Sequence, residues 1–124
     1  MNIRTWLVAL ALAALSSPAS AADESSPLSV CKELSIIAKD IMTARQENKP
    51  MSEALSMAIA LVKDWGDKND LGLDMEVAEE AAAPLVMGAY EEMIKSSDTY
   101  RRLAITEFEN EIFQECYEEM ISEE

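Results

Sequence analysis

The spacing of the apolar residues is the feature of this sequence that most restricts its fold. Between positions 27 and 121, apolar side chains recur every three or four residues, as one face of an α-helix requires. The clearest run is Val30, Leu34, Ile37 and Ile41. No stretch shows the strict alternation or the clustering of β-branched residues that is typical of a strand. The pattern therefore predicts an all-α fold.

Proline, glycine and short polar residues divide this pattern. Ser26-Pro27 opens the first helix, with serine as N-cap and proline at the first helical position. Pro50 separates it from a second helix, for which Ser52 is the expected cap. Gly66 is well placed to end that helix and to begin a polar loop over 66–74.

The second half of the chain predicts two or three more helices. Asp74 caps a helix that contains Pro84, and we expect this proline to kink or divide it near Ala83. Ser96-Ser97-Asp98 makes a break, and one long helix follows. Its apolar residues share a broad face, which consists of Tyr100, Leu103, Ala104, Ile105, Phe108, Ile112, Cys116 and Met120. Glutamates fill much of the rest, which we interpret as a solvated surface.

The two cysteines, Cys31 and Cys116, stand near the two ends of the helical pattern. An even pair in an oxidising compartment predicts a disulfide. Apolar stripes run forward from Cys31 and backward from Cys116, so a bridge would set them opposite each other in antiparallel helices. We expect a small four- to five-helix bundle whose first and last helices are antiparallel and linked by this disulfide.

The first 21 residues have the order of a cleavable signal peptide. One basic residue, Arg4, precedes the apolar run 6–15, and the small residues Ala19-Ser20-Ala21 follow. We expect cleavage after Ala21 or after Ala22. The run is about half of the roughly 20 apolar residues that a membrane span needs, so we expect no membrane association after cleavage. The prediction is an exported protein.

The predicted mature chain forms one domain. We expect a flexible segment at 22–26, a single helical domain at 27–121 and an acidic tail at 122–124. About 103 residues remain after residue 21, which is enough for one compact domain and too few for two.

The chain is strongly acidic, with ten Lys and Arg against 24 Asp and Glu, a net charge of −14. Only Arg4 falls in the leader, so the mature chain keeps nine cations against the same 24 acids and carries −15. Such a charge disfavours nucleic acid and anionic membranes as partners and permits cationic proteins. We expect a protein partner of unknown identity.

Catalytic and cofactor motifs are missing from the sequence. There is no histidine, hence no usual triad base, and no phosphate-binding glycine loop. We therefore predict a protein that is not an enzyme and has no cofactor. The loop with Asp64, Asp67, Asp70 and Asp74 is a weak calcium candidate, because Ala78 stands where the bidentate Glu of a calcium loop belongs. We favour an acidic turn with helix caps.

One polar pair, Arg45-Gln46, ends the first apolar stripe. Two interpretations stay open: a candidate contact surface, or a partly buried ion pair between Arg45 and an acid of the last helix.

Several segments together resemble a group of short exported proteins of proteobacteria and their phages. These segments are Cys31, Ile41-Met42-Thr43-Ala44-Arg45-Gln46, Met51-Ser52, Ala89-Tyr90-Glu91, Glu107-Phe108 and Cys116. The likeness covers both ends of the mature chain and thins between Val62 and Pro84. It implies a periplasmic context and a bridge between the two cysteines, and it implies no mechanism.

The expected function is that of a non-catalytic periplasmic interaction or structural protein. Two alternatives remain. The charge would suit an acid-stress periplasmic chaperone, because protonation of the acids reverses the sign of the chain. It would also suit an inhibitor or immunity-type partner of a basic enzyme.

Overall fold

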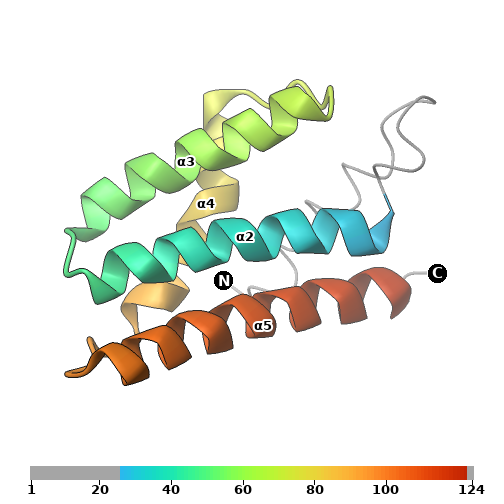
Figure 1. Ribbon diagram of the computed structural model, residues 1–124. Coiled ribbons are helices and arrows are strands. Elements are labelled where there is room, and N and C mark those ends of the chain that lie inside the picture. The colour runs from blue at the N-terminus through green and yellow to red at the C-terminus, as the bar shows by residue number, and fades with distance from the viewer. Residues whose placement is uncertain (1–25, 123–124) are drawn as a thin grey trace.

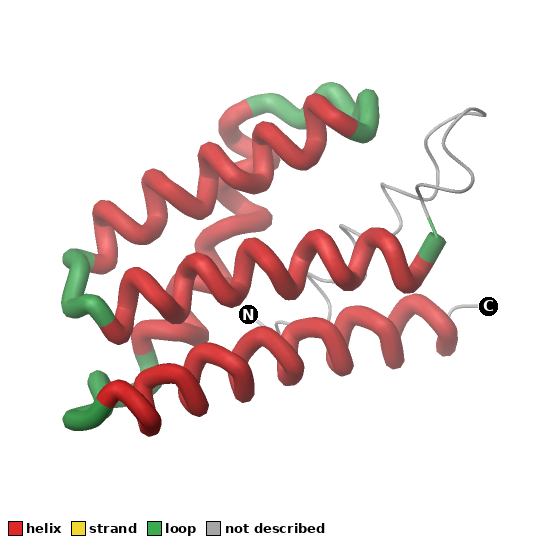
Figure 2. Tube along the Cα trace, in the orientation of Figure 1, coloured by secondary structure: helices red, strands yellow, loops and turns green. Residues whose placement is uncertain are grey.

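The computed structural model describes residues 26–122, which form four helices and no strand (Figures 1 and 2). The helices are α2 (Pro27–Gln46), α3 (Met51–Lys68), α4 (Met75–Tyr90) and α5 (Asp98–Ser122). The predicted leader at 1–21, the mature residues 22–25 and tail residues 123–124 lie outside the described residues. Within 26–122, no helix is both long and apolar enough to cross a membrane. The all-α class is confirmed.

Helix α2 is the centre of the fold. It packs against α3, α4 and α5, and α3 also packs against α4 (Figure 1). Much of the surface of α2 is therefore buried. Leu34, Ala38 and Ile41 face the interior with almost no exposed surface. Removing this apolar surface from water is the main force that holds the helices together.

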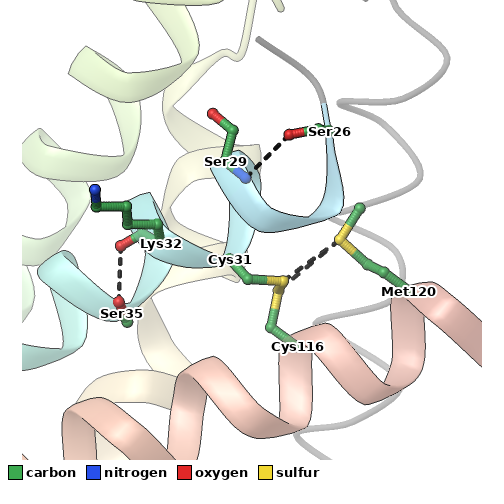
Figure 3. Close-up of a disulfide and its surroundings, with 7 residues drawn as sticks. All are labelled: Ser26, Ser29, Cys31, Lys32, Ser35, Cys116 and Met120. Atoms are coloured by element: carbon green, nitrogen blue, oxygen red, sulfur yellow. Dashed lines mark hydrogen bonds between the residues drawn. A yellow bond between two sulfur atoms is a disulfide. The ribbon is translucent and has the colours of Figure 1, made fainter. Parts of the chain in front are cut away.

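The disulfide is confirmed between Cys31, near the start of α2, and Cys116, near the end of α5 (Figure 3). The two Cα atoms lie 5.6 Å apart, within the usual range for a bridge. The sulfur of Met120 lies 3.5 Å from Sγ of Cys31 and seals the buried bridge. Because 85 positions separate the cysteines, the bridge closes most of the domain into one loop.

Two of the predicted caps are confirmed. Ser26 accepts a hydrogen bond from the backbone N–H of Ser29, and Pro27 is the first residue of α2. Asp74 accepts one from the N–H of Val77 at the start of α4. Each side chain satisfies a donor that the first helical turn leaves without a partner.

The predicted cap at Ser52 is wrong, because α3 begins one residue before it. Pro50 is the N-cap, and its carbonyl accepts from the N–H groups of Glu53 and Ala54. The extended backbone of Pro50 therefore already presents the first acceptor, and no side-chain cap is used.

The predicted end of α3 at Gly66 is also wrong. The helix runs on to Lys68, and Gly66 is buried inside it against Leu73. A Cβ at position 66 would lie 2.6 Å from Cδ1 of Leu73. The glycine therefore lets the returning loop approach the helix closely, and the reversal comes later, at Asp70 and Gly72, which both have positive φ.

Pro84 does not divide α4, so the five-helix alternative is not supported. The helix is continuous from Met75 to Tyr90, with Pro84 inside it. Proline removes one backbone donor, which costs stability in a helix interior. The buried neighbours Leu85 and Val86 are fully covered by the core, and we attribute the intact helix to their packing.

Candidate functional site

A groove lies between α4 and α5 and is called here the α4–α5 groove. Both helices pack against α2 but barely against each other. The space left between them measures about 1100 Å³. Met42 of α2 lies at its base.

The α4 side of the groove is acidic. Glutamate side chains line it along the length of the helix and just beyond its end: Glu76, Glu79, Glu80, Glu91 and Glu92. Helical spacing explains their alignment, because residues three or four apart share one face of a helix.

The α5 side repeats this arrangement with a stricter spacing. Glu107, Glu111 and Glu115 follow one another at intervals of four residues and form a single acidic row. Glu107 and Glu111 are exposed to solvent. Beside this row runs the stripe that faces α2, in which Phe108 and Ile112 are buried.

The base and lower walls of the groove are apolar. Met42, Phe108 and Ile112 reach the groove from the core, and Pro84 and Met87 reach it from α4. Met87 is the most accessible of these, with 57% of its surface exposed. No Lys or Arg is among the described residues that line the groove. The groove thus combines an apolar floor with carboxylates on both rims.

The predicted pair Arg45-Gln46 is not part of the groove lining, although Arg45 contacts Glu92, which is; the pair lies at the opposite end of α2 from the disulfide. Arg45 donates through Nε to the carbonyl of Glu92 at 2.9 Å, and its guanidinium lies 4.9 Å from the ring centre of Tyr90. A backbone carbonyl and an aromatic ring therefore hold Arg45, where the sequence analysis had considered an acid of the last helix.

Gln46 is almost fully buried and uses both ends of its amide. Its Nε2 donates to the carbonyl of Met93 at 3.0 Å, and its Oε1 accepts from the N–H of Lys95 at 2.8 Å. The carbonyl of Lys95 in turn accepts from Nε of Arg101 at 2.9 Å. These bonds fasten the segment 91–97, which joins α4 to α5, to the end of α2.

Tyr90 completes this attachment. Its hydroxyl donates to the carbonyl of Lys49 at 2.7 Å. Burial raises the pKa of this hydroxyl above the ordinary value of 10.0; the Arg45 guanidinium lowers it and Glu53 raises it, both by less than burial does.

Three of the four aspartates of the weak calcium candidate have separate partners. Asp64 pairs with Lys68 at 3.1 Å and Asp67 with Lys63 at 3.3 Å, both across one turn of α3. Asp74 caps α4, and Asp70 has positive φ in the turn. Across residues 26–122, no group of three or more Cys, Asp or Glu side chains is arranged to hold a metal ion.

The groove was missed by the sequence analysis, although one of its signals is visible there. The row Glu107, Glu111, Glu115 lies directly beside the apolar stripe of the same helix. The local pattern indicates a solvated surface for these acids, because nothing in it shows that the acidic face of α4 lies across from them.

Comparisons with known proteins add no further assignment. A scan against protein-family models, a search of curated proteins and a search of solved structures each find no match for this chain. The likeness to short exported proteins stays a prediction.

Proposed function

We propose that this protein is an exported, non-catalytic interaction protein that recognises a positively charged protein partner through the α4–α5 groove. The observation that carries the proposal is the combination in one groove of an apolar floor and acidic rims. Apolar surface supplies affinity when it is covered, and the carboxylates attract and orient a cationic partner. If the partner is a basic enzyme, the role is that of an inhibitor or immunity-type protein.

The proposal includes α2 and α5 as an antiparallel pair that forms the rigid frame of the groove. Two observations support this arrangement. The disulfide ties the start of α2 to the end of α5, and Gln46 ties the end of α2 to Lys95, just before α5 begins. Bonds at both ends would keep one wall of the groove fixed while a partner binds.

Photo-crosslinking in the periplasm tests the proposed surface. A photoreactive residue at Met87 should form a discrete adduct with a partner, and high salt should diminish that adduct. Met75 offers a matched control, because it is equally exposed, at 58%, and does not line the groove. Equal adducts from both positions, or none from Met87, would refute the groove as the recognition surface.

Export is tested separately by the intact mass of protein recovered from the periplasm. We expect a chain that begins at Ala22 or Asp23, is two hydrogens lighter than the reduced chain and has no thiol available for alkylation. A retained leader would contradict this part of the proposal.

An acid-stress chaperone is the second candidate, and the clustering of eight glutamates around an apolar floor favours it. Protonation of these side chains would leave that floor without charged rims. Suppression of client aggregation at about pH 3 but not at pH 7 is the expected result. Equal activity at both pH values, or none, would exclude this role.

A further inference from the structure

We propose that the occupant of the α4–α5 groove is a basic amphipathic α-helix, about four turns long, that belongs to the partner protein. The inference rests on the proposed function and specifies the shape and chemistry of the partner. Three features of the groove support it: the spacing of its walls, its size and its charge.

The spacing of the walls suits a helix. On α5, Phe108 and Ile112 lie one turn apart, and the acidic row beside them keeps the same interval. A bound helix carries its own apolar stripe at this interval, with flanking residues on both sides of the stripe. An extended chain alternates its side chains between two faces, so it cannot fill the floor and reach both rims with the same short segment.

The size of the groove agrees with this shape. Its lining on α4 runs from Glu76 to Glu91, which corresponds to about 22 Å at the helical rise of about 1.5 Å per residue. A helix of that length and about 10 Å diameter has a volume of about 1800 Å³. Half of it is about 900 Å³, close to the 1100 Å³ of the groove. A helix sunk to about half its depth would therefore fill the space.

The charge of the groove determines which helix fits. Acidic rims on both sides of an apolar floor complement a helix with an apolar stripe flanked by Lys or Arg. A second copy of this chain is a poor occupant, because its net charge of −14 opposes self-association. The same argument excludes acidic partners in general.

Synthetic peptides provide the direct test, with the full disulfide-bonded protein. One peptide of about 16 residues carries leucines on one stripe and lysines on both flanks, and a second has the same composition in scrambled order. We expect the first to bind at least about tenfold more tightly, to gain helicity by circular dichroism and to weaken as salt rises. Spermine, a polycation without an apolar stripe, should compete poorly.

Matched variants locate the binding site. Glu107→Gln/Glu111→Gln removes two rim charges and should weaken binding of the first peptide about tenfold at low salt. Glu33→Gln/Asp40→Asn makes the same change in net charge on an exposed face of α2, and it should change affinity less than about twofold.

The apolar floor has its own pair of variants. Met87→Gln should weaken binding about fivefold, whereas Met75→Gln, at an equally exposed position outside the groove, should have no effect. We expect every variant to keep the fold, because all of the substituted positions are exposed and only Met87 belongs to the groove floor. Circular dichroism of each variant checks this.

The outcomes separate this inference from the proposed function. Equal binding of the scrambled peptide, or no binding of either, would overturn the helical occupant, while a Met87-specific crosslink would still support the groove as the recognition surface. If the peptide bound both groove variants with unchanged affinity, it would bind elsewhere on the protein, and the inference would be overturned. If a photoreactive residue at Met87 also gave no specific crosslink, the proposed function would be refuted as well.

Discussion

Helix α5 has two surfaces of opposite character, and residues that are adjacent in the chain belong to different surfaces. The surface of α5 that faces α2 is called here the α2–α5 seam. Its residues Phe108, Ile112 and Cys116 are buried, and the disulfide links the two helices there. Towards α4, Glu107 and Glu111 stand open on the rim of the groove. The α2 side of this helix is thus part of the stabilised fold, whereas the groove side leaves charged groups, together with Met87 of α4, exposed to a partner.

Of the variants considered, the one that lacks the disulfide should show the largest loss of stability. Cys31→Ser/Cys116→Ser should lower the free energy of unfolding by about 2–5 kcal/mol, because a closed loop of 85 positions restricts the unfolded chain. Urea unfolding of the oxidised protein and of the variant measures the difference. Glu107→Gln/Glu111→Gln is the control from the groove side of α5, with a change below about 1 kcal/mol. A disulfide effect no larger than this control would show that the seam does not depend on its bridge.

Loss of Gln46 should weaken the attachment of the segment 91–97 to the end of α2, with a smaller effect on stability. Gln46→Ala leaves the carbonyl of Met93 and the N–H of Lys95 without their buried partner, at a cost of about 1–3 kcal/mol. Hydrogen exchange should show faster exchange across 91–97 in this variant. The matched control is Gln114→Ala, whose amide donates to the exposed Glu118 and whose loss should change the free energy of unfolding by less than about 0.5 kcal/mol. If the two variants behaved alike, Gln46 would not hold the connection.

Much of the fold follows from local patterns, and its exceptions have physical causes. The caps at Ser26 and Asp74 depend only on nearby residues, so the sequence predicts them correctly. The end of α3 was misplaced because Gly66 serves a contact with Leu73 that only the folded chain creates. Pro84 was expected to kink or divide α4, but the helix is not divided, and we attribute this to the packing of its buried neighbours Leu85 and Val86.

Prediction of α5 shows the same limit. Its apolar face was expected to include Tyr100 and Leu103, yet these are 61% and 48% exposed. The helix packs mainly against one neighbour, so only a narrow stripe at four-residue spacing is buried. A sequence gives the face of a helix but not the number of its neighbours. For the same reason, the groove could not be predicted, because its two acidic sides come from helices that only α2 brings together.

Tyr90 should make the stability of the protein depend on pH in the alkaline range. Its hydroxyl pKa is raised in the folded protein, mainly by burial, so the protonated form is favoured on folding. The contribution of this proton to stability is complete below the unfolded pKa of about 10 and is lost as pH rises through the higher folded value. Tyr90→Phe should cost about 0.5–1.5 kcal/mol at neutral pH, through the lost bond to Lys49, and the difference should narrow towards about pH 11. Urea unfolding at the two pH values measures this; a gap that widens with pH would contradict the assigned direction.

The smallest expected effect on stability distinguishes the two surfaces of α5 most clearly. Substitution on the groove side should raise the free energy of unfolding, whereas substitution at the seam should lower it. Glu107, Glu111 and Glu115 are like charges one turn apart, and each such pair destabilises a helix by about 0.2–0.5 kcal/mol. Glu107→Gln/Glu111→Gln should therefore raise the free energy of unfolding by about 0.5 kcal/mol at low salt, and the gain should vanish at high salt.

The control is Glu33→Gln/Asp40→Asn, which changes the net charge equally but relieves no pair of acids one turn apart. Substitution of a residue that stabilises the fold lowers the free energy of unfolding of the protein, as we expect for the two cysteines of the α2–α5 seam. A row of charges whose removal stabilises the protein, while weakening the binding of a cationic helix, is kept at the expense of stability, and recognition is then the reason for its presence. If neutralising the row instead destabilised the protein, these glutamates would belong to the frame, and the distinction between seam and groove would be lost.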